Sequence, residues 1–286
     1  MRDNDMSLKP ISRSIRIVED AIRISGESGI RYSARERLSL FRARMTRGCE
    51  AQVLDYRVKY LNRASFRIAL WEIFFKGEYR FTARTEAPVI LDCGANIGLA
   101  TLFFKHFYPQ ARITAFEADP NIADVLKANI ANNNLRDVEV QNLMLANTEG
   151  ESTFFVANDP AGSLMGSANP NRVFDHREVT VPAARLSRFI KGPVDFLKLD
   201  VEGSEFDVLE DLIETGSLSQ IASMVIEYHH KIGSSPSRLS RFLGTLEDHG
   251  YEYQIGAVGC DPITLQDVYQ DITIGAYRRG DVSKTP

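Results

Sequence analysis

The feature that most constrains the fold is a glycine-containing turn between a short apolar run and a longer apolar segment. The run at residues 89–91 has the length of a strand, the turn covers residues 92–98, and the Gly-free segment 99–107 is predicted to be a helix. A strand, a glycine turn and a helix in this order place a ligand over the carboxyl end of the strand and the N-terminus of the helix. Gly94 and Gly98 leave room where the backbone turns sharply and approaches such a ligand.

The turn carries an acid as well as its glycines. Asp92 stands at the end of the predicted strand, and the spacing D-x-G-x-x-x-G differs from the G-x-G-x-x-G of dinucleotide-binding enzymes. A carboxylate here suits a ligand with an ammonium group better than one with a pyrophosphate, which favours S-adenosylmethionine (SAM) as the cofactor. The competing interpretation is an ordinary turn between strand and helix, where Gly and Asn serve the backbone alone.

A second acid follows at the spacing of one strand–helix–strand unit. Residues 112–116 are predicted to form the next strand, which ends at Glu117. Glu117 is therefore expected at the strand tip beside Asp92, where a carboxylate can accept both hydroxyls of a ribose. Alternatively, Glu117 and Asp119 only cap the helix predicted over residues 121–132. Two strand-tip acids around a glycine turn favour a nucleoside-binding crevice.

A third strand is predicted over residues 138–143, at the edge where the adenine ring of such a cofactor is expected. Leu143 or Met144 at its end can supply an apolar face to that ring. Packing in the core explains either residue equally well.

Composition describes an ordinary soluble chain. Of its 286 residues, 44% are hydrophobic and 25% are charged, and no apolar run approaches the roughly 20 residues of a membrane span, so no membrane partner is expected. The N-terminus has no apolar segment of the secretory kind. Cys49, Cys93 and Cys260 are widely separated and lack C-x-x-C spacing, which favours a cytoplasmic protein. Cys93 is interpreted as a small packed residue, because no His lies near it in sequence.

Charge is unevenly distributed along the chain. Residues 1–60 carry 13 Lys and Arg against 8 Asp and Glu, whereas the remainder is acidic. A basic segment can contact an anionic substrate, a nucleic acid or an acidic partner, but a solvated helical face is the preferred interpretation. The Arg residues are scattered and not interleaved with base-stacking aromatic residues, so no nucleic-acid partner is expected.

The first 65 residues are predicted to form a mostly helical extension. Apolar residues recur at helical spacing between residues 11 and 47, with a break at residues 26–29, which predicts two helices. This extension, residues 1–65, is expected to act as a lid, a substrate contact or the contact of a homodimer. Residues 66–286 form the main domain.

Two segments are candidate walls of a substrate site. Glu72 and Tyr79 stand shortly before the first strand of the main domain. Residues 158–174 are rich in Gly, Ser, Asn and Pro and show neither helical nor strand periodicity. A loop of this length in a compact domain is mobile or functional, which makes Ser163 and Ser167 candidate substrate contacts.

A second group of charged residues follows a buried strand predicted over residues 194–199. A period of two places Lys198, Asp200 and Glu202 on one side while the backbone stays extended. Three charged groups at one strand tip are costly to bury unless they serve a ligand or one another. A simple pair of Lys198 with a carboxylate is the structural alternative.

The next strand, predicted over residues 223–230, adds Glu227 and His229 on one face. His229 has the natural pKa to remove a proton near neutral pH and is the candidate general base, with Asp200 or Glu202 as the alternative. If a divalent cation such as Mg²⁺ is bound, its candidate ligands are Asp200, Glu202, Glu227 and His229. Two hydrogen-bonded pairs explain the same residues.

Four segments, in this order and spacing, resemble the FkbM family of SAM-dependent methyltransferases: VILDCGANIGLATLFF, AFEADP, VDFLKLDVEGSEFDVL and MVIEYHH. The resemblance covers about residues 66–278. It implies an α/β fold with a class I, Rossmann-like, seven-stranded methyltransferase sheet and helices on both faces. Two departures from the family pattern are Leu186-Ser187, where Leu-Asp is usual, and Met144, where Ala is common.

The resemblance also implies roles for individual residues. Asp92, Gly94, Asn96 and Gly98 would surround the methionine end of SAM, and Glu117, with Ala118 beside it, would hold the ribose. Lys198, Asp200 and Glu202 match the second family motif, and Glu227 matches the acid of the fifth strand; Lys198 and Glu227 join Tyr79 and Ser163 as substrate candidates.

The sequence therefore predicts transfer of a methyl group from SAM to a hydroxyl of a small-molecule, sugar or natural-product acceptor. A catalytically silent SAM-binding module is one alternative. An NAD-dependent oxidoreductase is another, although the glycine spacing argues against it. Nucleic-acid methylation ranks lowest, because the chain lacks a [DN]-P-P-[YFW] tetrapeptide and its main body is acidic.

Overall fold

A seven-stranded sheet forms the centre of the molecule. The computed structural model describes residues 29–158, 166–173, 175–232, 238–256 and 270–278. In spatial order the strands are β12 (Tyr251–Ile255), β13 (Gln270–Arg278), β11 (Ile221–His230), β10 (Val194–Leu199), β3 (Val89–Cys93), β4 (Arg112–Phe116) and β5 (Val138–Gln141). β13 pairs antiparallel with β11 and β12, and the other pairs are parallel. This is the predicted class I methyltransferase sheet.

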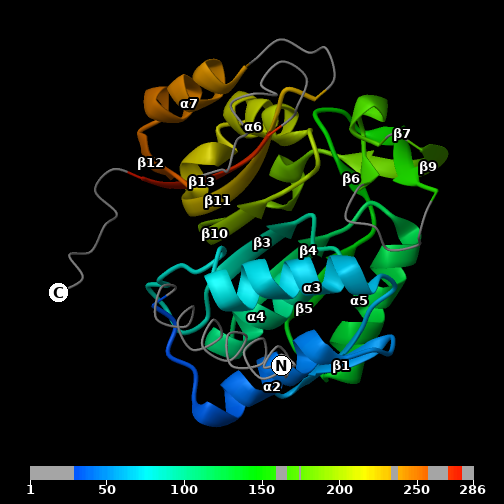
Figure 1. Cartoon of the computed structure of the whole chain (residues 1–286). Helices are drawn as coiled ribbons and strands as arrows, with labels where there is room; N and C mark the ends of the chain where they lie inside the picture. The colour runs from blue at the N-terminus through cyan, green and yellow to red at the C-terminus, as the bar shows by residue number, and fades with distance from the viewer. Residues whose placement is uncertain (1–28, 159–165, 174, 233–237, 257–269, 279–286) are drawn as a thin grey trace, which may run out of the picture.

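Helices cover both faces of this sheet (Figure 1). One face carries α6 (Glu205–Glu214) and α7 (Leu239–Asp248), and the other carries α3 (Arg63–Leu70), α4 (Leu99–Phe107) and α5 (Pro120–Asn132). Successive residues of β3 therefore enter different cores: Ile90 packs with α4, whereas Leu91 packs with α6. Burial on both faces explains why these strands are continuous apolar runs in the sequence.

A smaller sheet lies beside the central one; three of its strands are labelled β6, β7 and β9 in Figure 1. Its order is β6 (Met144–Leu145), β9 (His176–Ala184), β7 (Gly150–Ala157) and β8 (Gly166–Ser167). The segment 158–174 was predicted to lack regular structure, but β8 pairs with Phe155 and Val156 and a 3₁₀ turn, η2, follows at Pro170–Arg172. Local composition does not reveal β8, because its hydrogen-bond partners lie in β7. Ser163 lies outside the described residues.

The described part of the N-terminal extension packs against the main body. It contains α2 (Ala34–Met45) and a hairpin of β1 (Glu50–Val53) and β2 (Tyr56–Lys59). Their buried apolar side chains belong to the same cluster as those of α4. Asn129 of α5 also holds the hairpin: its Nδ2 donates to the Lys59 carbonyl at 3.0 Å, and its Oδ1 accepts from the Lys59 amide at 2.8 Å. The first predicted helix of the extension lies outside the described residues.

The helical segment that precedes the central sheet changes type along its length. It begins as α3, and a π-helical turn, η1 (Trp71–Lys76), ends at Gly77 with φ 69°. The chain then brings Tyr79 into the interior, where it is 5% exposed. Two more 3₁₀ turns, η3 (Leu186–Phe189) and η4 (Ser217–Gln220), complete the described elements.

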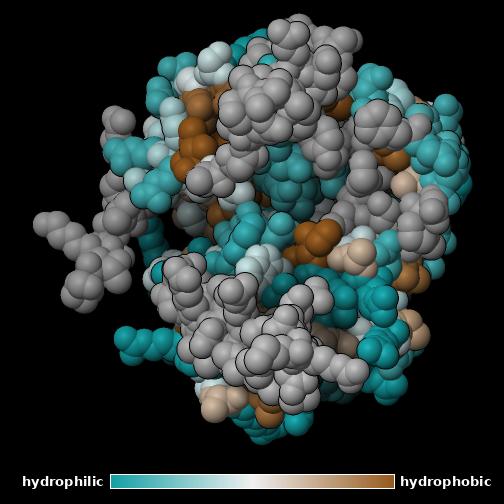
Figure 2. All heavy atoms as spheres, viewed as in Figure 1, coloured by the Kyte–Doolittle hydropathy of each residue, from teal (hydrophilic) through white to brown (hydrophobic). Residues whose placement is uncertain are grey.

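The coloured surface in Figure 2 is mostly hydrophilic, and its apolar residues form small separate areas. Within the described ranges, no helix is both long enough and apolar enough to cross a bilayer.

Candidate functional site

A cavity lies at the carboxyl ends of β3, β4 and β10, and the small sheet forms its other wall. Its empty space is about 1060 Å³, open mouth included, which is at the upper end of the range of small-molecule sites. The sequence-predicted site residues in its lining are Gly94, Asn96, Glu117, Ala118, Leu143, Met144, Asp200 and Glu202. The cavity is thus where the nucleoside crevice was expected.

The glycine turn is shaped by a close approach between two chain segments. Gly94 has φ 80°, and a Cβ placed on it would lie 1.7 Å from the carbonyl oxygen of Asp200. Only glycine fits such a contact. Gly98, with φ 93°, instead faces Leu126 of α5, whose Cδ1 would lie 2.7 Å from an added Cβ. Gly98 therefore allows α4 and α5 to pack closely and is not part of the cavity lining.

Glu117 is held at the cavity by two backbone amides. Its Oε2 accepts a hydrogen bond from the Asn96 amide and its Oε1 accepts one from the Asp119 amide, both at 2.9 Å. Burial raises the pKa of Glu117 to about 7, although both amides act to lower it. Asp119 caps α5 by accepting from the Asn121 amide at 2.8 Å. Asp119 therefore caps α5, whereas the carboxylate of Glu117 lies in the cavity wall.

Asp92 does not lie in the cavity lining, contrary to the expectation that it meets the cofactor directly. It is fully buried between β3 and α4, where its Oδ2 accepts from the Thr101 hydroxyl at 2.6 Å. Its Oδ1 lies 3.7 Å from Lys198 Nζ. Burial raises the pKa of Asp92, and the Lys198 ammonium opposes this shift. Sequence position alone does not show to which side of a strand tip an acid turns.

Lys198 connects the glycine turn with the second charged group. Its Nζ donates to the carbonyl oxygen of Gly94 at 2.6 Å and to Asp200 Oδ2 at 3.2 Å, and it lies 5.2 Å from the centre of the Tyr79 ring. Burial lowers the pKa of Lys198, but Asp200 and Asp92 raise it by more, so the ammonium stays charged. Lys198 and Tyr79, both buried, are therefore internal contacts of the turn in this structure.

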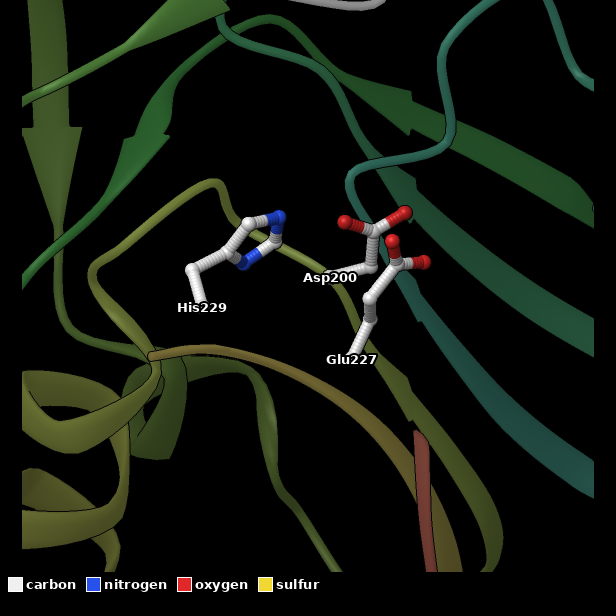
Figure 3. A group of neighbouring side chains, drawn as sticks. All are labelled: Asp200, Glu227 and His229. Atoms are coloured by element: carbon white, nitrogen blue, oxygen red, sulfur yellow. The ribbon is translucent and has the colours of Figure 1, made fainter. Parts of the chain in front are cut away.

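Asp200, Glu227 and His229 converge from the ends of β10 and β11 (Figure 3). One ligand atom from each lies within 4.8 Å of the others. The Asp200 carboxylate, followed by burial, raises the pKa of Glu227 far above its ordinary value. The structure thus gathers like charges where the sequence predicted a carboxylate-rich strand tip.

Glu202 lines the same cavity as Asp200, but the strand period that relates Lys198 to Asp200 ends before Glu202. Its φ of 53° ends the extended backbone one residue before Gly203. Its carboxylate turns toward His229, with 3.2 Å between Oε2 and Nε2.

His229 is enclosed by carboxylates and does not line the cavity. Its side chain is 0% exposed, and its Nδ1 lies 2.9 Å from Glu205 Oε1. Burial lowers the pKa of His229, but Glu205 and Glu202 raise it by more, well above the ordinary value. A ring that keeps its proton at neutral pH is a poor general base, which shifts this role toward the carboxylates that line the cavity.

The small sheet supplies lining residues that the sequence did not indicate, among them Phe154, Val156 and Arg177. The available signal was the Thr, Phe and Val content of residues 151–156, which is typical of a strand but does not reveal what that strand faces. Ser167, a candidate substrate contact, is fully buried and donates its hydroxyl to the Glu202 carbonyl, so it holds the turn after β10.

Comparisons with known proteins identify a family and several similar proteins. The model of the methyltransferase FkbM domain matches residues 92–253. Methyltransferase sdnD of Sordaria araneosa is 30% identical over 235 residues, covering 71% of this chain and 88% of that protein. Methyltransferase 1 of Beauveria bassiana is 32% identical over 163 residues, covering 49% of this chain and 65% of that protein. A solved structure of methyltransferase FkbM from Methylobacillus flagellatus covers 93% of this chain and 60% of that one, with a TM-score of 0.46 and 14% identity.

The domain match begins at Asp92 and includes the glycine turn, Glu117 and the strand ends that carry Asp200 and His229. Because it spans more than half of the chain, the chain belongs to the FkbM family of SAM-dependent methyltransferases.

Proposed function

We propose that the protein transfers the methyl group of SAM to a hydroxyl oxygen of a small acceptor, such as a sugar or another natural product. The observation that supports this most is a single cavity that has Glu117 at one strand tip and Asp200 at another. A nucleoside and a hydroxylated acceptor can therefore meet end to end within one enclosure.

In this proposal the cofactor lies across the tips of β3 and β4. Glu117 accepts the ribose hydroxyls, with Ala118 beside it, and Leu143 and Met144 provide the apolar face for adenine. Gly94 and Asn96 bend the backbone around the methionine end. Asp92 and Gly98 support the turn from outside the cavity, since Asp92 faces Thr101 and Lys198.

The chain's main task is to align the reacting groups. SAM supplies a methyl group that its sulfonium already makes electrophilic, whereas a neutral hydroxyl is a weak nucleophile. In the proposed transfer the S–CH₃ bond would break as the O–CH₃ bond forms, which would leave a neutral thioether, and the hydroxyl proton would pass to a carboxylate. Asp200 lines the cavity and is oriented by Lys198, so we assign proton acceptance to the group of carboxylates around Asp200.

The remaining features of the proposal concern partners and setting. The acceptor is a small molecule, and no nucleic acid or membrane takes part. Residues 1–65 provide the contact of a homodimer or cover the acceptor, and the protein works in the cytoplasm. These statements stay predictions of the sequence.

Calorimetry of the purified chain with SAM, S-adenosylhomocysteine and NAD⁺ tests the cofactor. We expect binding of the first two compounds and none of NAD⁺. Glu117→Gln should weaken SAM binding at least tenfold, whereas Glu86→Gln, which changes an exposed acid, should leave it unchanged. Equal SAM affinity in wild type and Glu117→Gln would contradict the proposed ribose contact.

A panel of hydroxylated acceptors, followed by mass spectrometry, tests the reaction. We expect a product heavier by one methyl group in place of hydrogen, together with S-adenosylhomocysteine. SAM binding without turnover across a broad panel would instead identify a catalytically silent module.

A further inference from the structure

We propose that Asp200, Glu227 and His229 bind one hard divalent cation, of the Mn²⁺ or Mg²⁺ type, beside the cofactor cavity. This inference rests on the proposed function for its role in catalysis, but the binding itself can be measured without any methyl transfer.

The first observation is the convergence of three ligand types from two adjacent strands (Figure 3). A carboxylate oxygen of Asp200, one of Glu227 and a ring nitrogen of His229 lie within 4.8 Å of one another. Ligands on opposite sides of a Mg²⁺ ion with bonds of about 2.1 Å are about 4.2 Å apart, so the three atoms reach a common ion after side-chain shifts of a few tenths of an ångström. One ion therefore fits between them.

The second observation is the orientation of a fully buried imidazole. His229 Nδ1 lies 2.9 Å from Glu205 Oε1, and its other nitrogen, Nε2, forms no hydrogen bond of good geometry with a described residue. Nε2 lies 3.2 Å from Glu202 Oε2 and 3.7 Å from Asp271 Oδ1. A carboxylate that orients one ring nitrogen while the other is turned toward further carboxylates is the arrangement typical of a metal-binding histidine.

The third observation concerns charge. Carboxylate oxygens of Glu227 and Asp200 lie within 4.8 Å of each other, so two like charges meet at one place. Lys198 offsets part of the charge of Asp200, but it also bonds to the Gly94 carbonyl and lies near Asp92. A divalent cation between the two would neutralise both carboxylates.

The ligand set limits the kind of ion. Two carboxylates and one imidazole leave coordination positions for water and for an acceptor oxygen, which suits Mn²⁺ and Mg²⁺ better than a closed structural zinc site. Bound there, the ion would hold the acceptor hydroxyl and lower its pKa. The O–H bond then loses its proton to a carboxylate or water as the O–CH₃ bond forms.

Titration of the full-length, EDTA-treated chain with Mn²⁺ alone, followed by electron paramagnetic resonance, tests the site. We expect one saturable Mn²⁺ per chain, displaced by excess Mg²⁺. Glu227→Gln and Asp200→Asn should each weaken Mn²⁺ binding at least tenfold. The matched control is Glu72→Gln, because Glu72 is another half-buried acid that interacts with Asp200; it should change the affinity less than twofold.

Absence of saturable Mn²⁺ binding to the wild type would overturn the proposal. Equal weakening of Mn²⁺ binding by Glu72→Gln would also overturn it, because the ion would then be attracted diffusely to an acidic surface. The melting temperature of each variant, measured without metal, shows whether it folds. If either Glu227→Gln or Asp200→Asn does not fold, the Mn²⁺ affinity of the other variant tests the site. S-adenosylhomocysteine binding in EDTA is measured in parallel: if it fails while Mn²⁺ binds, the proposed function is wrong and the cation site stands.

Discussion

Lys198 Nζ lies 2.6 Å from the carbonyl oxygen of Gly94, so a fully enclosed ammonium on β10 is bonded directly to the glycine turn after β3. The same Nζ lies 3.7 Å from Asp92 and 3.2 Å from Asp200. One side chain therefore compensates two acids and fixes the turn that we assign to the cofactor.

Lys198→Met should be strongly destabilising. It leaves Asp92 and Asp200 without their cation, and breaking a buried ion pair by removing one partner typically costs about 3–5 kcal/mol. Urea denaturation gives the free energy of unfolding. Lys127→Met is the control, because the ion pair of Lys127 with Asp124 is exposed and is expected to contribute only about 0.2–1 kcal/mol. A similar loss in both variants would mean that Lys198 is not a structural cation.

Gly94→Ala should destabilise the fold and abolish SAM binding. The added Cβ meets the Asp200 carbonyl in addition to the strain of a positive φ. Gly216→Ala separates the two effects, because Gly216 has φ 71° and nothing within 4 Å of an added Cβ. That control should cost about 1–2 kcal/mol from backbone strain alone, and Gly94→Ala clearly more. Equal costs in denaturation experiments would rule out the close approach of Asp200.

SAM affinity should increase with pH through about 7. Burial holds the pKa of Glu117 near 7, so below this value the free protein keeps a proton on the carboxyl group. That proton must leave before both ribose hydroxyls can donate to the carboxylate, which weakens binding by up to about tenfold for each pH unit below 7. Above 7 the cost vanishes and the affinity levels off.

Calorimetry at several pH values in buffers of different ionisation enthalpy checks this step and the accompanying proton release. In Glu117→Gln the step should disappear, leaving weak binding that varies with pH only through SAM itself. A step of the same size in that variant would assign it to another group.

Asn129→Ala should loosen the contact between the N-terminal hairpin and the main body. Besides bonding Lys59, the Asn129 amide donates to the Ile97 carbonyl in the glycine turn at 2.8 Å. Its loss leaves buried backbone groups unpaired, at about 1–3 kcal/mol. Asn133→Ala is the control, because Asn133 makes similar bonds to Arg57 at a more exposed position. Hydrogen exchange of β2 should accelerate much more in Asn129→Ala.

The elements that the sequence predicted best are those whose apolar pattern is set by burial on both faces of the sheet. The helix at Leu99–Phe107 and the strand at Arg112–Phe116 have the predicted bounds because their apolar runs begin and end with the buried segment. Strand periodicity could not define the direction of the Glu202 side chain, because it cannot anticipate a left-handed backbone before Gly203. Asp92 was misplaced since its buried partners, Thr101 and Lys198, are on other elements.

The cavity wall formed by the small sheet was also hard to predict, because it depends on contacts between segments far apart in the sequence. Phe154 and Arg177 come from β7 and β9, and their positions depend on long-range pairing between those strands. No local pattern in the sequence indicates that a second sheet packs beside the first.

Because of that second sheet, two different sheets line different parts of the cavity. The residues that we assign to the ribose and methionine end are fixed by the central strands and by Lys198, whereas Phe154, Val156 and Arg177 stand on strands of the separate, smaller sheet. Substitutions on β7 and β9 can therefore reshape the cavity while leaving the proposed ribose and methionine contacts of the central strands in place. Descendants of one ancestral enzyme could in this way acquire new acceptors while keeping the same methyl donor.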